Sequence, residues 1–210
     1  MRNHGNGKPQ GPLDEVLGGV PHVRILRYLS RVGGDHTGRA IGRAVQVSHP
    51  VVHRVMRTLA ERQVVHAVRH GAAIAYRLNQ EHWLVQSGLA ALFEAETAFL
   101  SKIGEAVRAA SGVPVLSVIV FGSLARGEAG QDSDLDLMCL TTRSKDVSEA
   151  EGNLAGVAGG LQRRFGRHLS VMVSSKREFS RRFRAKDRLV REIVETGWAI
   201  AGEPLSEVLR

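Results

Sequence analysis

Residues 118–140 read VIVFGSLARGEAGQDSDLDLMCL, and this stretch decides the fold of the second half of the chain. An apolar run with strand character ends in Gly122 and Ser123, a polar turn follows, and a second apolar strand carries Asp134 and Asp136. Because side chains alternate between the two faces of a strand, carboxylates two residues apart project from the same side. Such a pair opposite a Gly-Ser turn is able to hold a divalent cation against a nucleoside triphosphate.

Composition sets limits on the class of protein. The chain has 210 residues, of which 43% are hydrophobic and 24% charged, so one or two globular domains are expected. It has no run of eighteen apolar residues, and residues 1–12 read as a flexible tail without the apolar core of a signal peptide. The single cysteine, Cys139, lies in an apolar strand and favours a buried small residue over a reactive thiol. With no internal disulfide, a cytoplasmic location is expected.

The positive charge lies in the first part of the chain. Residues 1–80 hold 12 Lys and Arg against 4 Asp and Glu, whereas residues 81–210 hold 17 of each kind. Seven of the nine histidines also fall within residues 1–80. This asymmetry indicates two modules, the first of which faces a polyanion.

Residues 13–80 predict three helices followed by a β-hairpin. Apolar residues at helical spacing run from Leu13 to Val32, and a short helix follows with Thr37 as its expected N-cap. A third helix, with Ser48 as its candidate N-cap, runs to about Glu61. Two strands, 64–68 and 72–78, are expected on either side of a turn at residues 69–71. This order is typical of a winged helix-turn-helix, in which the third helix enters the DNA major groove.

Basic side chains on the expected outer surface predict double-stranded DNA as a partner. The candidate DNA-binding residues, on the third helix, the helix before it and the hairpin, are His49, His53, Arg54, Arg57, Arg39, Arg43 and Arg69. Residues 47–65, VSHPVVHRVMRTLAERQVV, and residues 73–84, AIAYRLNQEHWL, resemble winged-helix modules of bacterial transcription regulators. The alternative is that these side chains form a solvated face and that the module packs on protein.

The rest of the chain predicts a linker and a second domain, so the expected fold class is α+β. Residues 81–112 read as a helical linker of one or two helices, and residues 113–210 as a small mixed sheet with helices. The expected strands are 115–121, 134–141, 168–175 and 198–201, and the expected helices are 148–165 and 176–196.

Residues 121–140, FGSLARGEAGQDSDLDLMCL, resemble the signature of the DNA polymerase β-like nucleotidyltransferase superfamily in its minimal bacterial form. The resemblance implies a nucleotidyltransferase fold, Mg²⁺ or Mn²⁺ as cofactor, and a nucleoside triphosphate as substrate or ligand. It implies that Asp134 and Asp136 are the catalytic, metal-binding carboxylates. It also implies that Gly122, Ser123, Arg126 and Ser133 contact the nucleotide.

The sequence departs from the family pattern at one point. Active members commonly carry a third carboxylate on the next core strand, and residues 168–175, HLSVMVSS, contain no acid; the nearest are Glu178 and Asp187. The whole chain resembles helix-turn-helix-linked nucleotidyltransferases of bacteria and archaea. Two interpretations follow: a Mg²⁺-dependent transfer of a nucleotide to an unknown acceptor, or a non-catalytic, nucleotide-sensing regulator or antitoxin-like protein that binds a protein partner. A homodimer is expected in either case, since DNA readers pair to cover two half-sites.

Overall fold

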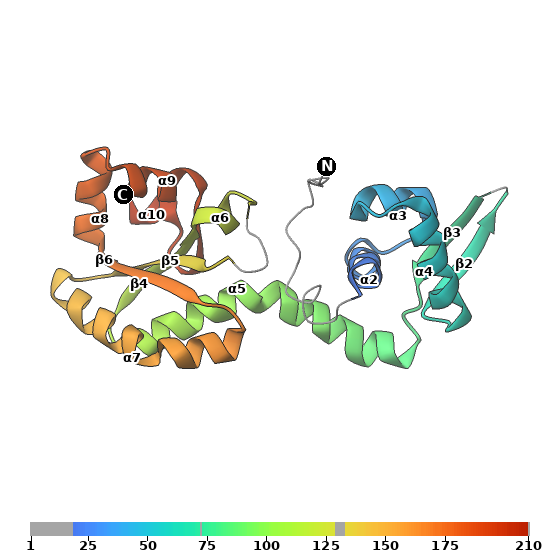
Figure 1. The fold of residues 1–210 in the computed structure, drawn as a ribbon, viewed down its shortest axis with the longest axis horizontal. Helices are drawn as coiled ribbons and strands as arrows, with labels where there is room; N and C mark the ends of the chain where they lie inside the picture. Colours follow the sequence, from blue (N-terminus) through green and yellow to red (C-terminus); the bar gives the residue numbers. More distant parts are fainter. Residues whose placement is uncertain (1–18, 72, 129–132, 210) are drawn as a thin grey trace, which may run out of the picture. The chain divides into compact units, whose positions relative to one another are not determined.

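The computed structural model describes residues 19–71, 73–128 and 133–209 (Figure 1). The chain divides into two compact units between Thr97 and Ala98, and each unit is described by itself. Among the described helices, none is both long and apolar enough to cross a membrane.

In its described residues up to Leu78, unit 1 forms three helices and a small antiparallel sheet with strand order β1-β3-β2. Its elements are α2 (Val20–Val32), β1 (His36–Thr37), α3 (Gly38–Val45), α4 (His49–Glu61), β2 (Val65–His70) and β3 (Ala73–Leu78). The three helices bury one face each against the sheet, through side chains that include Ile25, Ile41, Val52 and Met56. The expected order of three helices and a hairpin is therefore present, while residues 13–18 of the first expected helix lie outside the described residues.

Local details of unit 1 differ from the expectation at two places. The Thr37 hydroxyl caps α3 by accepting from the Ala40 amide at 3.2 Å, as expected, but Ser48 precedes α4 without a capping hydrogen bond from its side chain. The hairpin turn is also tighter than predicted. Arg69 does not lie in the turn, because it pairs with Ile74 inside the β2–β3 ladder.

The stretch expected as a linker is helical. A π-helical turn at Val85–Leu89 leads into α5 (Ala90–Ser111), and the boundary between the units falls inside this helix. The beginning of α5 is held within unit 1 by a buried ion pair, in which Arg27 donates from Nε and Nη2 to Glu96 at 2.5 and 2.7 Å.

Unit 2 is built on a four-stranded mixed sheet with strand order β6-β5-β4-β7. The strands are β4 (Val115–Phe121), β5 (Leu135–Thr141), β6 (Leu169–Ser175) and β7 (Trp198–Gly202). Only the β5–β6 pair is parallel, because the long helix α7 (Val147–Phe165) carries the chain back to start β6 beside the start of β5. The short helix α6 (Gly122–Ala125) follows β4 directly.

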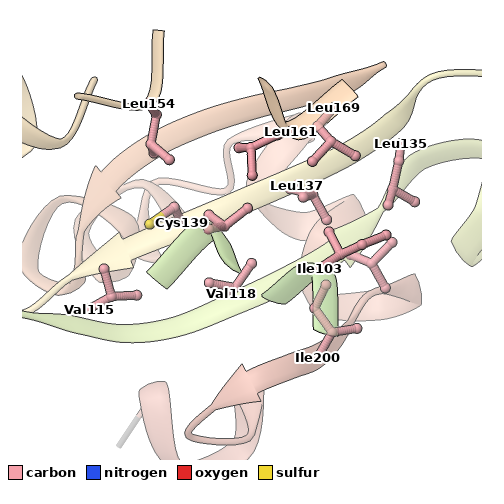
Figure 2. Close-up of a cluster of buried hydrophobic side chains, with 12 residues drawn as sticks. Ile103, Val115, Val118, Leu135, Leu137, Cys139, Leu154, Leu161, Leu169 and Ile200 are labelled. Atoms are coloured by element: carbon pink, nitrogen blue, oxygen red, sulfur yellow. The ribbon is translucent and has the colours of Figure 1, made fainter. Parts of the chain in front are cut away.

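Helices cover both faces of this sheet (Figure 1). On one face, α5 and α7 pack on the odd-numbered residues of β5, Leu135, Leu137 and Cys139 (Figure 2). Burial there raises the pKa of the Cys139 thiol to about 11, as fits a structural residue. On the other face, Met138 and Leu140 pack with side chains of α8 (Lys176–Arg184), α9 (Arg188–Thr196) and α10 (Leu205–Val208). Strand alternation therefore directs Asp136 to the α9 face.

The single helix expected over residues 176–196 is two helices. The chain turns at Lys186, whose φ of 58° lies in the left-handed region, and Asp187 starts α9 by accepting from the Val190 amide at 3.1 Å. A charged amphipathic pattern continues across the break, so the pattern alone does not reveal it. The break lets α8 and α9 follow different directions over the sheet (Figure 1).

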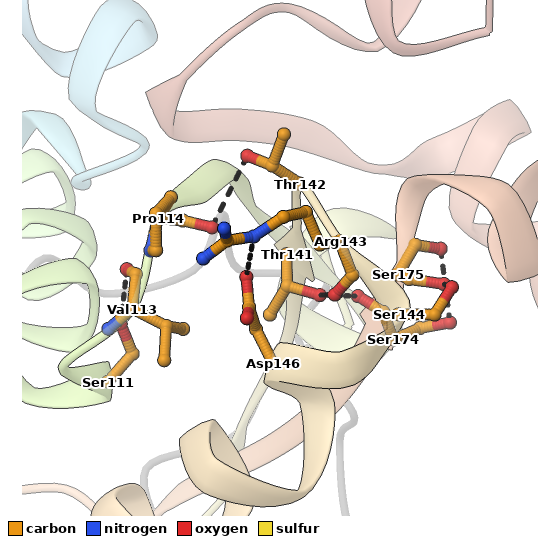
Figure 3. A network of polar contacts seen from close by, with 10 residues as sticks. All are labelled: Ser111, Val113, Pro114, Thr141, Thr142, Arg143, Ser144, Asp146, Ser174 and Ser175. Carbon is orange, nitrogen blue, oxygen red and sulfur yellow. Dashed lines mark hydrogen bonds and ion pairs between the residues drawn. The ribbon is translucent and has the colours of Figure 1, made fainter.

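The ends of β5 and β6 farthest from Asp136 are tied by side-chain hydrogen bonds (Figure 3). Arg143 donates to the buried Asp146 at 2.8 Å, and the Ser144 and Ser175 hydroxyls lie 3.1 Å apart. Ser175 also caps α8 by accepting from the Glu178 amide at 3.2 Å. Since Ser175 pairs with Thr141 and not with the start of β5, Glu178 lies at the opposite end of the sheet from Asp134 and Asp136.

Candidate functional site

The candidate site begins where β4 ends. Phe121 pairs with Asp136 across the β4–β5 ladder, and the chain turns into α6 at Gly122 with φ of 71°. A Cβ on residue 122 would clash with Asp136 Oδ2 and come within 3.0 Å of its Cγ. The resemblance to nucleotidyltransferases implies that Gly122 contacts the nucleotide. The neighbour that requires glycine in this structure is the Asp136 carboxylate.

Asp134 and Asp136 lie close enough to interact. The pKa of Asp136 is raised, chiefly because the carboxylate is partly buried and further because Asp134 carries a like charge beside it. Asp134 is more exposed, and its Oδ2 lies 3.2 Å from Nδ1 of His168, the residue that precedes β6. The sequence analysis missed His168, which the parallel β5–β6 pairing brings to Asp134.

The two aspartates fit a divalent cation of the magnesium type. Mg²⁺ is commonly bound through one or two carboxylates together with substrate phosphates, and a like-charge pair is relieved by a cation. In the described part of the chain, no group of three or more His, Cys, Asp or Glu side chains is arranged to hold a metal ion. The protein groups therefore fit a site that is completed by the oxygens of a bound nucleotide.

Arg126 follows α6 directly. It donates from Nε to Glu128 at 2.8 Å and forms a short contact through Nη1 with Glu192 of α9. The hydrogen bond with Glu128 is the main cause of the raised pKa of Arg126. The Arg126 charge also lowers the pKa of Asp136, which shows that the guanidinium and the Asp136 carboxylate are electrostatic neighbours. In this structure Arg126 therefore forms surface ion pairs with two acids, Glu128 and Glu192.

The two serines flank the site differently. Ser123 is the second residue of α6, partly buried, and its carbonyl oxygen accepts from the Glu128 amide at 2.8 Å. Ser133 comes directly before Asp134 and is partly buried. Residues 129–132 lie outside the described residues.

The strand beside Asp136 carries no acid, as the sequence indicates. Ser170 of β6 is in register with Asp136, so it occupies the place nearest to the pair on that strand. Asp187 is used as the cap of α9 and pairs with Arg182 at 3.0 Å. Glu192 of α9 contacts Arg126, as Glu128 does, and sequence reasoning missed Glu192 because no short-range pattern shows that α9 returns to α6.

All seven candidate DNA-binding side chains of unit 1 are exposed. Arg39, Arg43 and His49 line one shallow hollow between α3 and α4, and Arg39, His49 and His53 line a second that reaches β3. Arg54 and Arg57 lie on α4 outside these hollows, and Arg57 Nε is 3.9 Å from Glu61. Arg69 lies on β2, one residue before its end.

Comparisons with known proteins agree with the geometry of unit 2. The protein-family model described as "Nucleotidyltransferase domain" matches residues 100–196. A search of curated proteins finds no match. Among solved structures, a chain of "Crystal structure of the toxin-antitoxin with AMP-PNP" is 17% identical with a TM-score of 0.37, over 51% of this chain and 77% of that chain. That likeness is too weak to define the fold. The segment that matches the family model, residues 100–196, includes β4, α6 and β5, which carry the candidate site.

Proposed function

We propose that unit 2 transfers a nucleoside monophosphate from a nucleoside triphosphate to an acceptor hydroxyl, and that unit 1 binds double-stranded DNA. The observation that carries the first part is the pairing of Asp134 and Asp136 on one face of the sheet, with Asp136 seated on Gly122 at the start of α6. A partly buried aspartate beside a second negative charge is of the kind found where an active site binds a cation.

Each residue of the site has a role in this proposal. Asp134 and Asp136 hold Mg²⁺ or Mn²⁺, which would stabilise the charge on the phosphate oxygens during transfer. Arg126 exchanges its acidic partners for phosphate oxygens, and Ser123 and Ser133 contact the nucleotide. The acceptor oxygen forms a bond to the α-phosphorus, the bond from that phosphorus to the bridging α–β oxygen breaks, pyrophosphate leaves, and the proton of the acceptor hydroxyl passes to water.

For unit 1, we propose a winged helix-turn-helix that reads DNA through α4. Three helices followed by the β2–β3 hairpin support this, as does the exposure of all seven candidate basic residues. Arg54 and Arg57 contact bases or phosphates in the major groove, and Arg39, Arg43 and Arg69 contact the backbone. A dimer covers two half-sites, and a monomeric mass at micromolar concentration in solution would count against the dimer.

A second candidate function is a non-catalytic one, in which unit 2 binds nucleotide and thereby changes the DNA affinity of unit 1 or the binding of a protein partner. The observation that favours it is Ser170, which stands beside Asp136 where active relatives commonly carry a third acid. Loss of a general base typically costs ~10²–10⁴-fold in rate.

The experiment that separates the two incubates the full-length protein with each α-labelled nucleoside triphosphate, Mg²⁺ or Mn²⁺, and cell extract. The Asp134→Asn/Asp136→Asn variant gives the background, and Glu195→Gln, an exposed change on α9, is the control. Label transfer by the wild type and the control above that background supports the transferase. An absence of transfer, together with a DNA affinity that shifts on adding nucleotide, supports the sensor and contradicts the transferase.

A further inference from the structure

The proposed transferase needs a third acid, and the strand that usually supplies it has none. Ser170, Met172 and Ser174 are the β6 residues on the Asp136 face, and none is ionisable. Among the described acids outside the pair, Glu178 lies at the far end of the sheet, where its amide donates to Ser175, and Glu128 is exposed and bound to Arg126. A carboxylate for the site has to come from another element.

Helix α9 brings one to the site. After α9 ends at Thr196, Trp198 pairs with Val120 in the β4–β7 ladder, so this end of the helix lies beside the end of β4. Val190 and Ile193 are fully buried against the sheet, which fixes the rotation of the helix. Glu192, between them, is only partly exposed and faces α6, where it contacts Arg126.

Helix α6 connects Glu192 with the aspartates. Glu192 contacts Arg126 directly after α6, and α6 begins at Gly122, the residue that lies against the Asp136 carboxylate. Glu195, one turn further along α9, is exposed and pairs with Arg191 at 3.3 Å. Glu192 and Glu195 are therefore the same type of residue on the same helix, but only Glu192 contacts Arg126.

We propose that Glu192 is the third carboxylate of the nucleotidyltransferase site and that Arg126 controls when it acts. Without nucleotide, Glu192 is held by Arg126; when a triphosphate engages Arg126, Glu192 is released to join Asp134 and Asp136 on the divalent cation. The inference rests on the proposed function.

The exchange follows from the charges present. A guanidinium makes strong, often bidentate hydrogen bonds to phosphate, so a triphosphate competes for Arg126 with Glu128 and Glu192. Once released, the Glu192 carboxylate lies near two other carboxylates, and a cation between them removes the repulsion. Without nucleotide, the two aspartates would bind the cation weakly. A bound nucleotide would complete the site in two ways, by adding phosphate oxygens as ligands and by freeing Glu192 from Arg126.

The test measures Mn²⁺ affinity of the full-length protein by electron paramagnetic resonance, with and without α,β-methylene-ATP. With the nucleotide analogue, Glu192→Gln should bind Mn²⁺ about tenfold more weakly than the wild type. Without it, the two should bind Mn²⁺ equally, because Glu192 is occupied by Arg126. Glu195→Gln should match the wild type in both conditions. Equal affinity of Glu192→Gln and wild type in the presence of the analogue would overturn the proposal.

A second set of variants tests the control by Arg126. Arg126→Ala/Glu195→Gln and Arg126→Ala/Glu192→Gln have the same net charge, and only the first keeps the released Glu192. The first should bind Mn²⁺ more tightly than the second without nucleotide; equal affinities would overturn the proposal. A different result would show that the proposed function itself is wrong: the Asp136→Asn variant would bind Mn²⁺ and the nucleotide analogue as tightly as the wild type does.

Discussion

The Asp136 carboxylate lies so close to the backbone of Gly122 that a Cβ at residue 122 would clash with Oδ2. Gly122 also has φ of 71°, a conformation that residues with a side chain rarely adopt. Both constraints act at the point where β4 passes into α6. The Gly-Ser turn therefore serves the fold by seating a carboxylate, in addition to any contact with nucleotide.

Gly122→Ala should destabilise the protein and weaken cation binding. Gly127→Ala is the matched control, since Gly127 has φ of 72° but open space where a Cβ would point. The left-handed conformation alone costs roughly 1–2 kcal/mol for a residue with a side chain. Urea unfolding should show about that loss for Gly127→Ala and a larger loss for Gly122→Ala. Mn²⁺ affinity should fall only in Gly122→Ala; equal behaviour of the two variants would contradict the role of the Asp136 contact.

Asp136→Asn should stabilise the folded protein at neutral pH while it abolishes activity. The pKa of Asp136 is raised by folding, so ionisation of Asp136 is less favourable in the folded than in the unfolded chain. The contribution of Asp136 to the free energy of unfolding is complete at a pH below the pKa of this residue in the unfolded chain. It is lost as the pH rises through the higher pKa of Asp136 in the folded protein. The difference in unfolding free energy between variant and wild type, measured without metal, should therefore grow from acid to neutral pH. A variant less stable than the wild type at neutral pH would contradict this.

Ser170→Asp should strengthen the site, because it places a carboxylate on β6 in register with Asp136. Mn²⁺ affinity should increase by about tenfold, and label transfer should rise if the wild-type rate is limited by a weak third acid. Ser170→Asn is the isosteric control without charge and should change neither. A Ser170→Asp protein with folded spectra and unchanged Mn²⁺ affinity would show that residue 170 does not face the cation.

Arg54→Ala and Arg57→Ala should each weaken binding to the DNA of the protein's own promoter region. An arginine that reads a base contributes roughly 1–3 kcal/mol, and removing an arginine that binds a phosphate should reduce the salt dependence of binding by about one charge. Arg163→Ala, which removes an exposed charge from α7 of unit 2, is the control. Fluorescence anisotropy at several salt concentrations measures both quantities. Unchanged affinity at low salt in both variants would remove α4 from the DNA interface.

The secondary structure of the site could be predicted because its signals are local. The apolar run before Gly122 and the alternation around Asp134 and Asp136 each lie within a few residues, and the structure has β4 and β5 at those places. The break at Lys186 was missed, because a charged amphipathic pattern continues through it. The neighbours contributed by distant segments were also missed. His168 reaches Asp134 through a parallel strand pairing, and Glu192 reaches Arg126 through the packing of α9, and neither relation has a signature in the linear sequence.

Transfer of a nucleotidyl group by unit 2 can be distinguished from other reactions of a triphosphate by the position of the label. The full-length protein is incubated with Mn²⁺, cell extract and ATP, GTP, CTP or UTP labelled at either the α- or the γ-phosphorus. Nucleotidyl transfer should carry the α-label to the acceptor, leave the γ-label in pyrophosphate, and disappear in Asp134→Asn/Asp136→Asn. Transfer of the γ-label, or of neither label from any of the four triphosphates, would contradict the account.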